Sequence, residues 1–243
     1  MAKEETSQKL KPPEHFWAHL EELRSRLIFC IIAIGVFSVL SYFFSGEIIS
    51  FLTRPLTALS QKLYFLSPYD AFLIKLQVSF WGGIFLTSPL LILQAWLFVV
   101  PGLYVKEKKM FIFALVPSIV LFLFGAAIAF FAVIPVTVRF FLGFSTPDLL
   151  PLISVQQYFS LVGWMMLAFG LAFDIPIFLV GLVKFGILQI RQLESLRRYI
   201  VIGIFIFSAI VTPSPDPFSQ CLLAIPLWVL FELSIVFARM VER

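Results

Sequence analysis

Charged residues are scarce in this chain of 243 residues, at 13% against the about 25% that is usual in soluble domains. Hydrophobic residues make up 60% of the sequence, 30 residues are phenylalanine, and the mean hydropathy is +1.01. This balance argues against a soluble domain. It predicts one integral membrane domain with lipid as its main solvent.

Cysteine and histidine are also rare, and their scarcity argues against disulfide, metal and hydrolase chemistry. The two cysteines, Cys30 and Cys221, lie inside apolar runs and suggest packed, inert thiols rather than a disulfide framework. His15 and His19 precede the first apolar run, so an intramembrane Ser–His hydrolase would have no base. The two are four residues apart, but no third ligand is clearly placed with them. We predict neither a metal site nor another cofactor.

Further enzyme and nucleotide motifs are missing as well. Tyr69–Asp70 could suggest an aspartyl intramembrane protease, but the partner Gly–Asp motif is absent and Asp70 lies at the end of an apolar run. The chain shows no glycine-rich phosphate loop. We therefore predict a protein that is not an enzyme and that binds no nucleic acid.

Long apolar runs predict an all-α fold with six transmembrane helices. A helix needs about 20 apolar residues to cross the hydrocarbon core. Residues 1–11 are expected to be a mobile tail without the apolar core of a cleavable signal peptide, so the first run would be an uncleaved anchor. The expected spans are approximately 27–45, 72–101, 109–136, 156–184, 199–213 and 219–238.

Lysine and arginine are strongly biased to one side of these spans. Fourteen of the 18 fall in the N-terminal segment, the loops after the second and fourth spans, and the C-terminus. The opposite side holds Arg54, Lys62 and Arg139. The bias predicts that both termini are cytoplasmic. On the opposite side, segments 46–60 and 139–155 are apolar and are expected to lie along the outer membrane surface.

Four prolines fall inside expected spans. Each removes a backbone donor and tends to kink its helix, so we expect a curved, concave assembly. These prolines are Pro89, Pro117, Pro176 and Pro226.

Residues 14–27, "EHFWAHLEELRSRL", have the pattern of an amphipathic helix on the cytoplasmic surface that leads into the first span. Glu22 and Arg26 are four residues apart, a spacing that allows a helical ion pair of about 0.2–0.5 kcal/mol.

A second carboxylate, Glu107, lies among Lys106, Lys108 and Lys109 at a predicted membrane edge. In one interpretation, Glu107 lies at a helix N-terminus, where the helix dipole stabilises its negative charge by about 0.3–1 kcal/mol. Another joins Glu107 with Glu22 on one cytoplasmic rim, where two carboxylates could receive two guanidinium groups. The lysines would then repel stray cations.

Four segments carry a resemblance to a known family. "HLEELRSRL" (19–27), "SPLLILQAWLFVVPGLYVKEKK" (88–109), "AFGLAFDIPIFL" (168–179) and "TPSPDPFSQCLLAIPLWVLFE" (212–232) are similar to TatC, the six-span core subunit of the twin-arginine protein translocase. The match covers nearly the whole chain in the right order.

The resemblance implies a receptor for twin-arginine signal peptides of folded precursors. It implies a bacterial cytoplasmic membrane location, an oligomeric complex with single-span TatA/TatB-type subunits, and use of the proton gradient. Glu22 and Glu107 match the family's acidic signal-binding pair, Phe98 an aromatic beside it, and Lys109 a nearby basic position.

Three more polar positions match the family. Asp174 lies within the fourth span, where the family often has glutamate, so its reach toward a partner helix is shorter by one methylene. An ionised carboxylate at that depth costs about 2.5–3.5 kcal/mol, and the alternative is a buried acceptor beside Pro176. Asp216 and Gln220 match the outer turn before the sixth span, where Asp216 could also cap the helix.

The alternative function is a proton- or ion-coupled secondary transporter. Lys75, Asp174 and Glu232 would then line a path near the membrane midplane. Such folds usually show internal repeats, and the sequence shows none.

Overall fold

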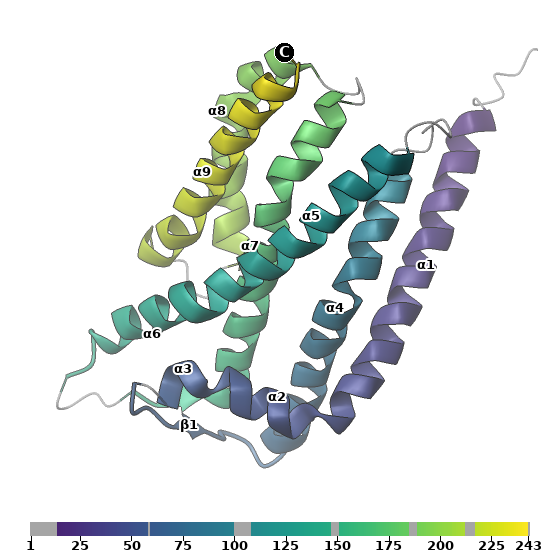
Figure 1. Cartoon of the computed structure of the whole chain (residues 1–243). Helices are drawn as coiled ribbons and strands as arrows, with labels where there is room; N and C mark the ends of the chain where they lie inside the picture. Colours follow the sequence, from purple (N-terminus) through teal and green to yellow (C-terminus); the bar gives the residue numbers. More distant parts are fainter. Residues whose placement is uncertain are drawn as a thin grey trace, which may run out of the picture.

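The computed structural model describes residues 14–57, 59–99, 108–146, 151–184, 189–211 and 217–242, and the side chains of 14–19 and 108–114 lie outside the description. Almost all of the described chain is helical (Figure 1). The long helices follow the apolar runs, since in lipid a helix satisfies its own backbone groups. They are α1 (Glu14–Phe43), α4 (Asp70–Val99), α5 (Lys108–Ile128), α7 (Val155–Lys184), α8 (Ile190–Val211) and α9 (Pro217–Glu242).

Five described segments are long and apolar enough to cross a membrane. They are Leu20–Phe43, Asp70–Phe98, Leu115–Leu142, Val155–Lys184 and Gln220–Met240. The helix α8 covers most of the expected fifth span, but its first half carries charged residues and it is not among the five. A helical membrane fold is thus confirmed, whereas the count of six spans stays a prediction.

The first helix runs without a break from the expected amphipathic segment into the first span. Its apolar side chains are largely exposed, as a lipid-facing helix requires, with Ile31 at 66% and Phe43 at 76%. The third span is also continuous, because α5 passes through a π-helical turn, η2 (Ala129–Val133), into α6 (Ile134–Leu142). All four prolines expected inside spans lie within helices. The concave curvature expected from them stays a prediction.

The helix α7 is central to the packing. It contacts α4, α5 and α9, while α1 packs against α4 and α8 against α9. The main core contains Val78 from α4, Phe159, Val162 and Met165 from α7, and Leu223 from α9. Residues from distant parts of the sequence therefore pack into one core.

Short elements gather at the end of the molecule opposite the start of α1 and the end of α9 (Figure 1). They include α2 (Ser45–Leu52), α3 (Arg54–Thr57), and the parallel pair β1 (Leu63–Tyr64) and β2 (Ile153–Ser154). The buried Tyr158 hydroxyl donates a hydrogen bond of 2.7 Å to the Leu52 carbonyl oxygen and so ties α7 to α2.

Candidate functional site

A polar recess lies between α1 and α4, on the side of the molecule where α1 begins. The Arg26 guanidinium donates to Glu22 Oε1 from Nε at 3.0 Å and from Nη2 at 2.6 Å. Its Nη1 donates to Gln94 Oε1 on α4 at 2.8 Å. Ser25 and Phe29 complete the lining of a hollow of about 370 Å³. The ion pair expected from the spacing of Glu22 and Arg26 is therefore confirmed.

The recess is partly shielded from solvent. The side chain of Arg26 is 23% exposed and that of Glu22 is 35% exposed. Charge-assisted hydrogen bonds in such surroundings are stronger than exposed ion pairs, which contribute only about 0–1 kcal/mol. The recess can therefore hold a planar cation by hydrogen bonds.

The other residues expected at this site are described to different degrees. Phe98 is half-buried on α4, one helical turn after Gln94 and on the same face. Lys109 lies in the first turn of α5, with its side chain outside the description. Glu107 lies outside the described residues. The structure thus brings Glu22, Arg26 and Gln94 together, and the pairing of Glu22 with Glu107 stays a prediction.

Asp174 lies in the second half of α7, facing α5. Its Oδ1 atom is buried and has no hydrogen-bond partner among the described residues, while the Ser118 side chain on α5 interacts with its carboxyl group. Ser118 Oγ also accepts a hydrogen bond of 3.1 Å from Trp96 Nε1 on α4. Trp96 is 1% exposed. Three helices therefore meet at this buried polar group.

The two residues expected at the outer turn before α9 are only partly described. Gln220 Nε2 donates a hydrogen bond of 2.9 Å to the Phe205 carbonyl oxygen, which joins α9 to α8. This contact is structural. Asp216 lies outside the described residues.

Asp70 has a structural role at the start of α4. Its Oδ2 atom accepts hydrogen bonds from the backbone N–H groups of Leu66 at 2.8 Å and Ser67 at 2.9 Å. The side chain is 3% exposed and fixes the turn that leads into the helix. This explains why a carboxylate lies at the end of an apolar run without a protease motif.

The three charges of the transporter alternative have separate surroundings. Lys75 is exposed near the start of α4. Glu232 on α9 pairs with Arg197 on α8 at 3.2 Å. Asp174 interacts with Ser118 instead. The described contacts give no common path for an ion.

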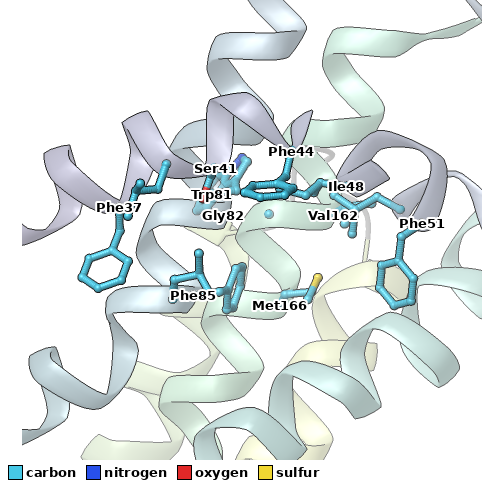
Figure 2. Close-up of a pocket in the computed structure, with 14 residues that line it drawn as sticks. Phe37, Ser41, Phe44, Ile48, Phe51, Trp81, Gly82, Phe85, Val162 and Met166 are labelled. Atoms are coloured by element: carbon cyan, nitrogen blue, oxygen red, sulfur yellow. The ribbon is translucent and has the colours of Figure 1, made fainter. Parts of the chain in front are cut away.

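An apolar groove of about 580 Å³ lies between α1, α2, α4 and α7, away from the polar recess. Figure 2 shows phenylalanines 37, 44, 51 and 85 around it, with Trp81 and Met166 on its wall. Its lining is suited to apolar groups, and its polar atoms include Ser41 Oγ and Trp81 Nε1, both buried without a hydrogen-bond partner among the described residues. Within the described residues, no group of three or more His, Cys, Asp and Glu side chains could hold a metal ion.

Sequence reasoning did not identify Gln94, Ser118 or Trp96 as parts of these sites. Gln94 is an amide inside the apolar run "LLILQAWLF", and that feature alone could have marked it. Ser118 gives no such signal, because a lone serine in a span usually bonds to its own helix.

Known proteins match the chain over nearly its full length. The profile of the family described as "Sec-independent protein translocase protein (TatC)" matches residues 18–226. A TatC protein from Magnetococcus marinus is 40% identical over 228 residues, covering 93% of this chain and 84% of that protein. One from Aquifex aeolicus is 38% identical, covering 93% and 95%. A solved structure described as the twin-arginine translocase receptor TatC has a TM-score of 0.84 and 38% identity, covering 93% of this chain and 100% of its own.

Proposed function

This chain belongs to the TatC family, and from that premise we propose that it is the receptor for twin-arginine signal peptides in a Sec-independent translocase for folded proteins. The observation that carries the proposal is the recess between α1 and α4, in which a carboxylate already binds a guanidinium in a partly shielded position. A translocase receptor has no need of a catalytic group, so the chain is a binding subunit rather than an enzyme.

Two carboxylates bind the two arginines of the signal peptide. Glu22 takes one guanidinium and Glu107 takes the other, since a carboxylate accepts the planar fork of arginine in two hydrogen bonds. Phe98 forms an apolar wall beside them. Lys109 and its neighbouring lysines disfavour other cations, so that only a well-placed pair of arginines binds.

The recess faces the cytoplasm of a bacterium, where precursors are made. The placement of Lys and Arg supports an orientation with both termini cytoplasmic. The first turns of α1 continue the first span without a break and emerge at the cytoplasmic membrane surface. The helix α8 is the additional, short crossing that completes six spans in the cytoplasmic membrane, where a thin or sheltered region accommodates it.

Single-span subunits of the TatA/TatB type assemble with this chain. Asp174, which is half-buried on α7, accepts a hydrogen bond on its carboxyl group from a polar side chain of such a subunit. Asp216 and Gln220 form the outer turn used during translocation. The proton gradient drives transport, since one charge moving through 100 mV releases about 2.3 kcal/mol.

Site-specific photocrosslinking tests the proposal. A photoreactive residue at position 25, which lines the recess and leaves both glutamates in place, should crosslink to a synthetic twin-arginine peptide, and much less to a peptide with two lysines. Position 21 is the matched control, because Glu21 is exposed on the same helix and does not line the recess. Equal crosslinking from positions 21 and 25 would contradict the site. Small-solute uptake by proteoliposomes, with no peptide binding, would support the transporter instead.

A further inference from the structure

The binding carboxylate of Glu22 is already occupied by a guanidinium of the same chain. Resting on the function proposed above, we propose that Arg26 is an internal competitor, a resident guanidinium that the arginine of a signal peptide displaces from Glu22 Oε1 and that sets the affinity of the site. The carboxylate that would receive the peptide therefore has an internal competitor of the same chemical class.

The contacts of Arg26 are those expected of such a competitor. Two of its nitrogens donate to Glu22 Oε1, and a third donates to Gln94 on the neighbouring helix. Its side chain is 23% exposed and borders an open hollow of about 370 Å³. An arriving planar group can therefore reach the carboxylate while Arg26 still has room to move aside.

Exchange of one guanidinium for another preserves the hydrogen bonds of Glu22. A lysine ammonium carries the same charge but lacks the planar fork, so a lysine that displaced Arg26 would leave part of the network unpaired. The apparent dissociation constant of any ligand rises when only a fraction of the protein has its site available. Arg26 thus weakens binding of every cationic peptide by the same factor, and the preference for arginine over lysine comes from the carboxylate of Glu22 itself.

The direct test is the affinity of Arg26→Gln for twin-arginine and twin-lysine peptides, with the full chain in detergent or nanodiscs. The twin-arginine peptide should bind about three- to tenfold more tightly than it binds the unchanged protein. The twin-lysine peptide should gain by the same factor, because the same competitor is removed for both peptides. The matched control is Arg24→Gln, which removes the same charge from an exposed position of α1. It should tighten binding of both peptides by a much smaller factor, because it leaves the Arg26–Glu22 pair in place.

A double-mutant cycle separates competition from a general change of charge. In the Glu22→Gln background, adding Arg26→Gln should give no gain in affinity, because the contested carboxylate is gone. Gln94→Met keeps Arg26 but removes its hydrogen bond to α4. It should give a smaller gain in the same direction, which provides a second variant if Arg26→Gln does not fold.

The outcomes distinguish this inference from the proposed function. If Glu22→Gln weakens twin-arginine binding while Arg26→Gln leaves it unchanged or weakens it, Arg26 only orients Glu22. The inference is then overturned and the proposed function stands. The inference is also overturned if Arg26→Gln tightens binding equally in the Glu22→Gln background. If Glu22→Gln itself has no effect on peptide binding, the proposed function fails as well.

Discussion

At the scale of the single residue, Asp174 places a buried carboxyl oxygen within the membrane-spanning helix α7. A buried polar atom without a hydrogen bond is costly, and Asp174 Oδ1 has no partner among the described residues. Although the aspartate side chain is one methylene shorter than a glutamate, it still interacts with Ser118. The Ser118 side chain thus holds the carboxyl group, while Oδ1 is enclosed by the fold without a hydrogen bond from the described residues.

Asp174→Ala should reduce co-purification of the single-span subunits by about tenfold, because a hydrogen bond accepted by the carboxyl group is lost. Asp174→Asn keeps a carbonyl acceptor of nearly the same shape and should retain most of the association. The measurement is the ratio of subunits after affinity purification from membranes. Full retention by Asp174→Ala, with the protein folded, would show that partners bind elsewhere.

Single residues differ in how far the sequence predicts their roles. Glu22 and Arg26 could be paired from their spacing alone, because four residues make one helical turn. The contact of Arg26 with Gln94 joins residues that are 68 positions apart, and it depends on how α1 packs on α4. The same holds for Trp96 and Ser118.

At the scale of the element, α4 and α7 meet through a large side chain on a small one. Trp81 on α4 is buried at 6% exposure, and a Cβ atom added at Gly163 of α7 would lie 2.0 Å from its Cε2 atom. Trp81 also meets Trp164 edge-on, with ring centroids 5.3 Å apart. The indole therefore fills the space that the missing side chain of Gly163 leaves.

Gly163→Ala should lower the free energy of unfolding by about 1–3 kcal/mol, because overpacking forces the indole or the helices apart. Gly203→Ala on α8 is the control. It has no neighbour within 4 Å of an added Cβ, and alanine favours a helix over glycine by about 1 kcal/mol. Thermal unfolding in detergent measures both. Equal melting temperatures for Gly163→Ala and the unchanged protein would contradict this packing.

The elements themselves follow closely from hydropathy, and their irregularities do not. The apolar runs indicate where long helices form, because a buried or lipid-facing helix must be apolar. The π-helical turn Ala129–Val133 precedes Pro135, and no periodicity marks it. The helix α8 extends well before the expected span because its charged first half packs on α9 through ion pairs such as Arg197–Glu232.

At the scale of the whole molecule, the start of α1 and the end of α9 lie at one end of the helical assembly, and the short elements lie at the other (Figure 1). The strand pair β1–β2 and the Tyr158–Leu52 hydrogen bond connect segments at the end with the short elements. With the termini in the cytoplasm, these connections would lie at the outer surface.

Cysteine labelling tests this orientation in a chain whose Cys30 and Cys221 are replaced by serine. Ser145→Cys, at an exposed position after α6, should react with a membrane-impermeant maleimide in intact spheroplasts. Ser195→Cys, exposed on α8, should react at least about tenfold less until the membrane is permeabilised, since a charged reagent cannot cross the hydrocarbon core. The reverse pattern would invert the orientation.

The Lys and Arg bias let the sequence predict an orientation for the whole molecule, because that bias acts through the loops alone. How α1 packs against α4 could not be predicted in this way. It depends on contacts between residues far apart in the sequence, such as Arg26 and Gln94, which no local pattern encodes.

The central claim is that Glu22 binds an arginine of the signal peptide, and one affinity comparison tests it most directly. The dissociation constant of a twin-arginine peptide is measured for Glu22→Gln and for Glu21→Gln, which removes an equal charge from the exposed neighbouring position. We predict a loss of about tenfold or more for Glu22→Gln and little change for Glu21→Gln. Equal affinities for the two variants would contradict the account.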